Sequence, residues 1–463
     1  MLTYSFENRG SDSLYEHLYK QIKADILAFR LSPDEKLPSK RSLAKHLNIS
    51  TVTVEGAYGQ LLAEGYIYSR PKSGYYVSRL SGTLAVQHME NAQSAEKSED
   101  SLFADLSGGH GEKDAFPFSA WAKLMRETMS VPPEKLMVRS PSAGIMELRE
   151  AIARHLYSFR GMRVRPEQIV VGAGTEYLYA LIIQLLGRDR LYAVEDPGYR
   201  KISRIYAANE VKCAFIPMDA RGVDPSALAK SGADILHISP SHHFPSGIVT
   251  PVSRRYELLS WVCAAPGRYI IEDDYDSELR LLGKPIPPLQ SIDALGKVIY
   301  INTFSKSLSS TIRISYMVLP EALMEEYEHR LSFYSCTVSN FDQYTLAAFI
   351  RGGHLEKHIN RMRNHYRSRR DELIACIKAK NTSTKAKIRE EDAGLHFLLE
   401  LDTPLSDREI VSRCQSAGLR VSCLSEYYHF PTGDSRTLLI NYAGLPFEKT
   451  HDAVERLFSA IWP

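Results

Sequence analysis

Lys306 has the sequence surroundings of a lysine that forms a Schiff base with a carbonyl cofactor. It follows an apolar run, hydroxyl residues flank it, and an arginine stands seven residues later. The lysine amine would supply the imine, and the side chains of Thr303, Ser305 and Arg313 could hold a phosphate group. A solvated lysine in a serine-rich loop is the simpler alternative, so the interpretation depends on motifs elsewhere.

The segment Tyr269–Asp276 supplies the first such motif, an apolar run that ends in consecutive carboxylates and a tyrosine. Acids after a buried strand lie at the C-terminal edge of a sheet, where open α/β folds bind ligands. Asp273, 33 residues before Lys306, could keep the ring nitrogen of pyridoxal phosphate protonated, and Tyr275 could bind the ring hydroxyl. Strand alternation favours Asp273, although Asp274 stays open for this role. A strand end with solvated acids is the alternative.

The segment Val170–Ile183 supplies the second motif, in which an apolar strand leads through Gly-Ala-Gly into a helical pattern. A glycine turn at a helix N-terminus binds phosphate because the first backbone N–H groups have no partner within the helix. We expect Gly174 and Thr175 to bind the phosphate and place Glu176 in the same cofactor site. A plain tight turn is the alternative.

These three segments, in this order and at these spacings, resemble fold-type I pyridoxal-phosphate enzymes of the aminotransferase class. The resemblance covers roughly residues 105–463 and implies an α/β domain that binds pyridoxal 5'-phosphate, with a small C-terminal α+β subdomain from about residue 350. Val194–Tyr199 is similar to the Glu-x-Pro-x-Tyr element of that class, so Tyr199 is expected to stack on the cofactor ring or, alternatively, to fill the core. Lys201 and Arg200 lie where some relatives bind a substrate carboxylate, and are candidates for binding an effector.

Some positions depart from the aminotransferase pattern. The segment Ser239–Gly247 lacks the asparagine that bonds the ring hydroxyl, and His242 or His243 could supply a nitrogen in its place. Leu439 stands where aminotransferases carry the arginine that grips the substrate α-carboxylate, and Arg420 is the candidate replacement. These losses argue against turnover of α-amino acids, because turnover relies on substrate orientation and ring electronics.

Length and composition limit the protein class independently of any motif. The chain of 463 residues suggests two or three domains, and 44% hydrophobic and 24% charged residues are ordinary for a soluble protein. No apolar run is long enough to span a membrane and the N-terminus lacks a signal-peptide pattern, so we expect a cytoplasmic protein. The six cysteines form no Cys-x-x-Cys pair, which argues against a zinc site and a disulfide framework, and no metal site is expected.

Residues 1–79 have the pattern of three helices and a hairpin. Apolar residues at i, i+4 spacing predict a helix over 13–29, with Ser13 as its cap. Further helices are expected over 38–47 and 51–64, the last ended by Gly65. Strand-like pieces at 66–68 and 75–77 enclose a basic hairpin tip. This is the layout of a winged helix-turn-helix, whose third helix enters the major groove of DNA.

DNA contacts are expected around the second helix, the start of the third helix and the hairpin tip. Small hydroxyl residues would meet base edges or phosphates, and basic residues would make salt-sensitive phosphate contacts. The net charge of residues 1–80 is 11 − 8 = +3, whereas the +2 of the whole chain makes no electrostatic case for nucleic acid. A protein-interaction module of three helices is the alternative. The expected contact residues are Ser39, Lys40, Arg41, Ser50, Thr51, Thr53, Arg70 and Lys72.

The strings Lys36–Ala44, Ser50–Leu61, Glu64–Ile67 and Gly74–Val77 resemble the GntR family of bacterial regulators. Residues 80–104 are polar and without sustained periodicity, as expected of a flexible linker. A GntR-type unit joined by a linker to an aminotransferase-like body, 105–463, resembles the MocR subfamily of GntR regulators over the whole chain. That resemblance implies a pyridoxal-phosphate-dependent regulator that binds double-stranded operator DNA as a homodimer with exchanged DNA-binding units.

Three functional hypotheses follow from these motifs. The first is a regulator that senses an amino-bearing effector through an aldimine at Lys306. The second is an active aminotransferase with an accessory DNA-binding domain. In the third, pyridoxal phosphate itself is the effector. The sequence leaves open the effector, the operator, and whether transcription is activated or repressed.

Overall fold

The computed structural model describes residues 2–4, 6, 12–71, 73–79, 102–108, 116–281, 286–381, 385–392, 394–430 and 433–462. The chain divides into two compact units, Met1–Glu96 and Lys97–Pro463. Lys72 and nearly all of the expected linker lie outside the described residues. Among the helices that are described, none combines the length and apolar character needed to cross a membrane.

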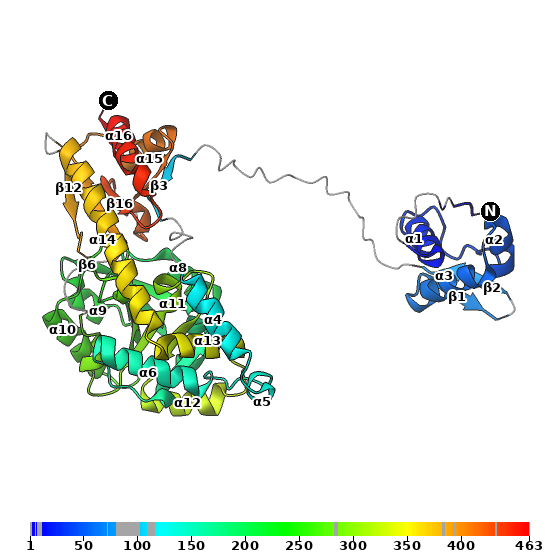
Figure 1. The fold of residues 1–463 in the computed structure, drawn as a ribbon, viewed down its shortest axis with the longest axis horizontal. Coiled ribbons are helices and arrows are strands. Elements are labelled where there is room, and N and C mark those ends of the chain that lie inside the picture. The colour runs from blue at the N-terminus through cyan, green and yellow to red at the C-terminus, as the bar shows by residue number, and fades with distance from the viewer. Residues whose placement is uncertain are drawn as a thin grey trace. The chain divides into compact units, whose positions relative to one another are not determined.

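The first unit consists of three helices and a two-stranded hairpin (Figure 1). Apolar side chains from all five elements form one core, in which Leu18, Leu43 and Tyr58 are fully buried. The winged helix-turn-helix predicted from the sequence is confirmed. Its elements are α1 (Leu14–Leu27), α2 (Lys40–Leu47), α3 (Thr51–Ala63) and the antiparallel strands β1 (Ile67–Arg70) and β2 (Gly74–Val77).

Local sequence signals determine the turn between α2 and α3. Asn48 adopts the left-handed conformation, with a φ of 54°, and ends α2. Ser50 then caps α3, since its hydroxyl accepts the Thr53 N–H at 3.0 Å. Such a cap satisfies one of the N–H groups that a helix start leaves unpaired, and stabilises by about 1 kcal/mol.

An eight-stranded sheet forms the centre of the second unit, in the order β4-β11-β10-β9-β8-β5-β6-β7. Strands β10, β9, β8, β5 and β6 are mutually parallel, whereas β11 is antiparallel to both of its neighbours. The strands are β4 (Ile169–Gly172), β5 (Leu191–Asp196), β6 (Lys212–Asp219), β7 (Gly222–Val223), β8 (Ile235–Ile238), β9 (Tyr269–Asp273), β10 (Val298–Thr303) and β11 (Ser315–Val318).

Helices cover both faces of this sheet, because parallel strands need crossover connections. Alternate residues of β9 face opposite sides, so Ile271 packs with the helices of one face and Ile270 with those of the other. The face of Ile271 is covered by α7 (Thr175–Leu186), α8 (Arg200–Ala208) and α12 (Glu321–Leu331). The opposite face is covered by α4 (Phe118–Thr128), α6 (Met146–Arg160), α9 (Pro225–Lys230), α10 (Val252–Cys263) and α13 (Asn340–Arg351).

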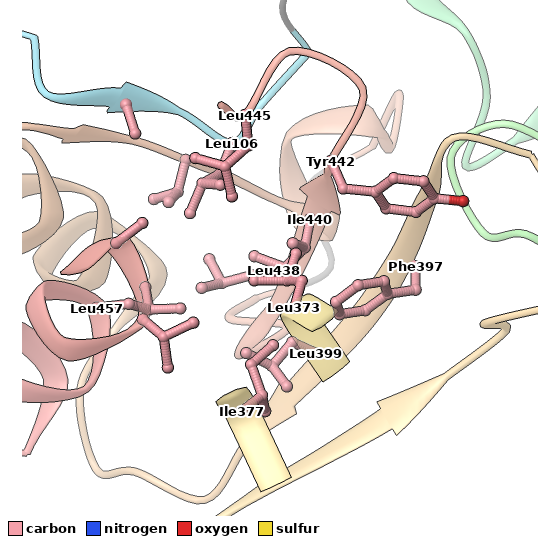
Figure 2. Close-up of a cluster of buried hydrophobic side chains, with 14 of the residues drawn as sticks. Leu106, Leu373, Ile377, Phe397, Leu399, Leu438, Ile440, Tyr442, Leu445 and Leu457 are labelled. Atoms are coloured by element: carbon pink, nitrogen blue, oxygen red, sulfur yellow. The ribbon is translucent and has the colours of Figure 1, made fainter. Parts of the chain in front are cut away.

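A separate core lies in the C-terminal part of this unit. Figure 2 shows it, with Leu373 and Ile377 beside Phe397 and Leu399. The long helix α14 (His354–Lys380) belongs to both cores, since its first turns pack with α13 and its later turns pack here (Figure 1). The other elements are the antiparallel sheet of β12 (Ala386–Arg389), β13 (His396–Leu401), β16 (Thr437–Asn441) and β15 (Ser422–Cys423), and the helices α15 (Asp407–Ser416) and α16 (Thr450–Ile461).

Candidate cofactor site and DNA-binding surface

The ends of four parallel strands gather the predicted cofactor residues at one edge of the large sheet. β9 ends at Asp273, which pairs with Ile301 of β10. Lys306 follows Ile301 by five residues. Lys306 itself is exposed, in the short helix α11 (Phe304–Ser307). β5 and β8 end at the same edge and lead to Tyr199 and to the pair of histidines His242 and His243. The topology therefore brings together segments that lie far apart in the sequence.

Asp273 is a buried carboxylate with one occupied oxygen. Its Oδ2 accepts a hydrogen bond from the Tyr179 hydroxyl and lies 3.6 Å from Nε2 of His237. Nδ1 of His237 is 2.6 Å from the Tyr206 hydroxyl, which fixes the orientation of the imidazole. Oδ1 of Asp273 is buried without a hydrogen-bond partner among the described residues. A buried acceptor left unpaired costs about 1–3 kcal/mol, so this oxygen fits a ligand N–H donor.

Asp274 lies on the opposite face of the sheet, as strand alternation requires. Its Oδ2 is 2.8 Å from Nη2 of Arg160 and accepts the Tyr300 hydroxyl at 2.6 Å. Arg160 and Asp274 are both buried, so the carboxylate is neutralised by an internal ion pair. Between the two neighbouring acids, this arrangement favours Asp273 as the partner of a ring nitrogen.

Tyr275 and His242 form a polar pair beside Asp273. The Tyr275 hydroxyl is 3.2 Å from Nδ1 of His242, which also lies 2.8 Å from Oδ2 of Asp276. Burial raises the pKa of Tyr275 well above its usual value, so the phenol stays protonated at neutral pH. Nε2 of His242 is buried and unpaired within the described part of the chain. The pair therefore offers a phenol and an imidazole to a ligand hydroxyl.

His243, the other predicted histidine, belongs to the protein interior. Its Nδ1 is 2.6 Å from the Ser246 hydroxyl, and its Nε2 is 3.5 Å from Oε2 of Glu195. Burial lowers the pKa of His243 to about 3 and raises the pKa of Glu195 to about 8. At neutral pH both groups are therefore largely uncharged, and their contact is not an ion pair. This favours His242 as the histidine that faces a cofactor.

The N-terminus of α7 combines the glycine turn with two basic side chains, at the place where a phosphate site is expected. Gly174 has a φ of 93°, and a Cβ placed on it would lie 2.5 Å from Nη2 of Arg313. Glu176 forms ion pairs with both Arg313 and Lys201, and its hydrogen bond with Lys201 is the largest cause of its lowered pKa. An anionic group thus already lies between two cations at a helix N-terminus, the surroundings that a phosphate requires.

The remaining predicted cofactor contacts differ in how available they are. Oγ1 of Thr303 accepts the Ser305 N–H at 3.1 Å and the Ser315 hydroxyl at 2.8 Å, so this hydroxyl is occupied within its own loop. Tyr199 is the N-cap residue of α8, with 48% of its surface exposed, and its ring centroid is 5.6 Å from that of Phe244. Tyr199 therefore does not fill the core and has a ring face available for stacking.

The structure argues against Arg420 as a replacement for the α-carboxylate arginine. Strand β14 (Leu419–Arg420) pairs with β3 (Ala104–Asp105), and Nη1 of Arg420 is 3.1 Å from Oδ2 of Asp105. Its guanidinium is thus engaged by an ion pair with Asp105 at the C-terminal core. Arg200 and Lys201 remain on α8 beside Tyr199, where Arg200 donates to the Tyr428 carbonyl at 3.3 Å.

Several predicted DNA contacts have internal roles in the winged helix. Ser39 and Ser50 cap α2 and α3, and the Thr53 hydroxyl is 2.7 Å from that of Ser50. Lys40 forms an ion pair with Glu55 at 2.6 Å. These side chains hold α2 and α3 in place, and their contacts with DNA stay predictions.

Of the predicted contacts, Ser39, Arg41, Ser50, Thr51 and Arg70 are exposed, and Lys72 lies outside the described residues. The guanidinium of Arg70 lies over the rings of Tyr68 and Tyr76, at 5.4 and 4.7 Å from their centroids. Val52, which the sequence analysis missed, is 77% exposed in the first turn of α3. An exposed valine at that place fits an apolar contact with a thymine methyl group in the major groove.

Comparisons with known proteins agree with both units. Residues 14–77 match the family model described as bacterial regulatory proteins, gntR family. The chain is 36% identical to the "Uncharacterized HTH-type transcriptional regulator YdeL" of Bacillus subtilis, over 99% of this chain and 98% of that one. It is 31% identical to the "HTH-type pyridoxine biosynthesis transcriptional regulator PdxR" of Corynebacterium glutamicum, over 90% and 89%. It is 29% identical to the "Probable rhizopine catabolism regulatory protein MocR" of Rhizobium meliloti, over 97% and 94%.

Solved aminotransferases share the fold of the second unit. A multiple substrate aminotransferase from Thermococcus profundus matches with a TM-score of 0.68 and 24% identity, over 77% of this chain and 90% of that one. The α-aminoadipate aminotransferase LysN from Thermus thermophilus, complexed with N-(5'-phosphopyridoxyl)-L-leucine, matches with a TM-score of 0.66 and 22% identity, over 78% and 92%. The predicted fold class is thereby confirmed. The chain belongs to the GntR family of bacterial transcription regulators, in the MocR/PdxR-type group that joins a winged helix-turn-helix to an aminotransferase-like domain.

Proposed function

We propose that this regulator binds pyridoxal 5'-phosphate in its aminotransferase-like unit and that occupancy of this site changes its binding to operator DNA. The observation that carries the proposal is the unpaired, buried Oδ1 of Asp273 at the sheet edge that also bears Lys306 and the cationic N-terminus of α7. An acceptor for the ring nitrogen, an amine and an anion site are the three groups that this cofactor requires.

Each candidate residue has a separate task towards the cofactor. Asp273, oriented by Tyr179 and His237, would hold the proton on the ring nitrogen, and Tyr275 with His242 would meet the ring hydroxyl. Arg313, Ser305 and the first N–H groups of α7 would receive the phosphate, Tyr199 would stack, and Lys306 would provide the attachment point. When bound, the cofactor supplies a carbonyl carbon that exchanges one amine for another.

Two observations favour sensing over transamination. Leu439 is fully buried in β16, and Arg420 is engaged with Asp105, so neither position presents a cation to a substrate carboxylate. The signal is then an amino-bearing effector or the cofactor itself. The name of the relative PdxR refers to regulation of pyridoxine biosynthesis, which supports the second of these.

The response would reach DNA through two winged helices of a homodimer, which we propose are exchanged between subunits. Two such units bind two half-sites whose spacing follows the geometry of the dimer. Coupling between the cofactor site and the DNA-binding surface must be reciprocal. If the cofactor changes the affinity for DNA by a given factor, DNA changes the affinity for the cofactor by the same factor.

Absorbance and DNA titration of the full-length protein test this proposal together. We expect a visible absorption band after addition of pyridoxal phosphate, and a changed affinity for a fluorescent DNA from the protein's own promoter region. A change with the cofactor alone identifies it as the signal, whereas a change only after addition of an amine identifies that amine. Absence of the visible band at saturating cofactor would exclude the proposed site.

Replacing Arg70 by alanine is expected to weaken DNA binding equally for operator and unrelated sequences. A guanidinium at the hairpin tip meets phosphates rather than bases, so the slope of log affinity against log salt should fall by about 1 for each lost contact. Fluorescence anisotropy at several salt concentrations measures this slope. Lys20→Ala is the control, because Lys20 on α1 is already paired with Asp12 at 2.7 Å. A loss confined to the operator would instead make Arg70 a base contact.

Replacing Glu176 by glutamine is expected to raise the affinity for pyridoxal phosphate by about 5-fold. The carboxylate competes with the phosphate for Arg313, and a partly exposed ion pair of this kind contributes up to about 1 kcal/mol. Titration of the visible band gives the affinity, with Glu167→Gln, an exposed acid of the same unit, as the control. A weaker affinity of the Glu176 variant would show that the carboxylate holds Arg313 in place for the phosphate.

A further inference from the structure

A cavity of about 490 Å³ is lined by one face of α8, which bears Arg200 and Arg204, by residues of β5 and β6, and by Tyr427 and His429. Its volume is that of a site for a small organic molecule. Among the residues expected to bind the cofactor, Tyr199 lines it, and so do His237, which lies 3.6 Å from Asp273, and Arg200, an expected effector contact. Lys306 and Asp273 do not belong to its lining, so the cavity adjoins the cofactor site.

The floor of this cavity is apolar. Val194 of β5 and Cys213 and Phe215 of β6 line it, together with Ala207 of α8. Burial raises the pKa of the Cys213 thiol to about 11, so this side chain is uncharged. Phe215 stacks on the ring of His429 with centroids 3.5 Å apart and an interplanar angle of 8°. An apolar or aromatic body would fit against these surfaces.

The rim of the cavity carries two guanidinium groups on one face of α8. Arg200 and Arg204 stand at i, i+4 and both line the cavity. Arg200 makes one hydrogen bond, to a carbonyl, and Arg204 has no hydrogen-bond or ion-pair partner among the residues described.

Of the two acids in the lining, Glu195 is largely neutral because burial raises its pKa to about 8. Asp196 is the other acid of the lining, and its Oδ1 accepts the backbone N–H of His429 at 2.8 Å. Two arginines against one carboxylate leave an excess positive charge, 2 − 1 = +1.

The segment 427–429 closes this cavity from the C-terminal part of the unit. The Gly198 N–H donates to the Tyr427 carbonyl at 3.1 Å, and Arg200 donates to the Tyr428 carbonyl at 3.3 Å. These two hydrogen bonds join the segment to the loop that carries Tyr199. A molecule in the cavity would touch both α8 and this segment, and would restrain one against the other.

We propose that this cavity is a second ligand site, which binds a small organic carboxylate with an apolar body through Arg200 and Arg204. The carboxylate lies at the basic rim and the apolar body lies on the floor of Val194, Cys213 and Phe215. This site goes beyond the proposed cofactor function, since it needs neither Lys306 nor Asp273. Occupancy of the two sites is expected to be coupled through Tyr199, which lines this cavity and is proposed to stack on the cofactor.

Calorimetric titration of the full-length protein, saturated with pyridoxal phosphate, tests the proposal with three probes. These are 4-phenylbutyrate, its uncharged analogue 4-phenylbutanol, and inorganic phosphate. We expect 4-phenylbutyrate to bind at least about 10-fold more tightly than either of the others, because only it offers both the charge and the apolar body. Equal binding of phosphate, or no heat from any of the probes, would overturn the proposal.

Three variants locate the binding. Arg204→Gln should weaken 4-phenylbutyrate by about 10-fold, the effect of one charge-assisted hydrogen bond. Ala207→Trp should fill the cavity and abolish binding, and the exposed position of Ala207 on α8 lets the helix accommodate the indole. Arg188→Gln, an exposed arginine in the turn before β5, should leave the affinity unchanged. Unchanged binding in both Arg204→Gln and Ala207→Trp would place the ligand elsewhere. The visible cofactor band, recorded in the same samples, shows separately whether the proposed function holds.

Discussion

Lys306→Ala is expected to abolish covalent attachment of pyridoxal phosphate. Lys306 follows β10 at the edge of the sheet where β9 ends at Asp273. Borohydride reduction of the loaded wild-type protein, followed by peptide mapping, should tag this lysine, and the variant should carry less than about 1% of that label, as expected when the only attacking amine is removed. The visible absorption band should disappear with the label.

Lys201 provides the matched control for this experiment. It is the second amine near the site, but its ammonium group is bound to Glu176 at the anion-binding end of the site. Lys201→Ala should therefore retain the label and the band. If the label persisted in Lys306→Ala and vanished in Lys201→Ala, the ring would lie in the opposite orientation to the one proposed.

The DNA-binding unit of Lys306→Ala should be unaffected, because the winged helix has its own core around Leu18, Leu43 and Tyr58. Binding of the unliganded variant to operator DNA should therefore stay within about 3-fold of wild type, as expected for a change outside the interface. Its affinity should no longer respond to pyridoxal phosphate. Fluorescence anisotropy with and without the cofactor measures both, and a preserved response would show that signalling does not need the lysine.

The sequence predicted the winged helix well because its signals are local. Capping serines, a left-handed asparagine before Ser50, and apolar residues at helical spacing all lie within a few residues of the elements they define. Two of these serines were also predicted to contact DNA. A serine before a helix fits the pattern of a cap as well as that of a phosphate contact. The hydrogen bonds show that Ser39 and Ser50 are caps, and their contact with DNA stays a prediction.

The cofactor site was predictable where its residues follow strand ends, and was not where they come from helices. Asp273 and Lys306 end or follow buried strands, so their meeting at one edge follows from parallel pairing. Tyr179 and His237 escaped notice because each lies in an apolar run, where a tyrosine or histidine resembles an ordinary core residue. The ion pair of Arg420 could not be foreseen, because its partner strand, β3, begins more than 300 residues earlier in the chain.

Asp273→Asn and Asp274→Asn are expected to have opposite effects, although the two residues are neighbours. Removing the charge of Asp273 removes a charge-assisted acceptor for the ring nitrogen. The affinity for pyridoxal phosphate should therefore fall by about 10- to 100-fold, the equivalent of about 1.5–3 kcal/mol. Thermal stability of the unliganded protein should change little, because the amide oxygen of Asn can still accept the Tyr179 hydroxyl and Oδ1 of Asp273 has no partner among the described residues to lose. Titration of the visible band measures the affinity.

Asp274→Asn should instead lower stability and leave the cofactor's affinity nearly unchanged. Its carboxylate is the 2.8 Å ion-pair partner of Arg160 in the buried layer beneath β9 and β10. Removing one member of a buried pair leaves the other charge uncompensated, at a cost of about 3–5 kcal/mol. Urea unfolding measures this loss, and the cofactor titration is done at a temperature at which both variants are folded.

A fall in affinity for Asp274→Asn with unchanged stability would place the ring nitrogen on the other face of β9. The expected phosphate site at Gly174 and Arg313, which lies with α7 on the face of Asp273, would then be too far from the ring to hold its phosphate.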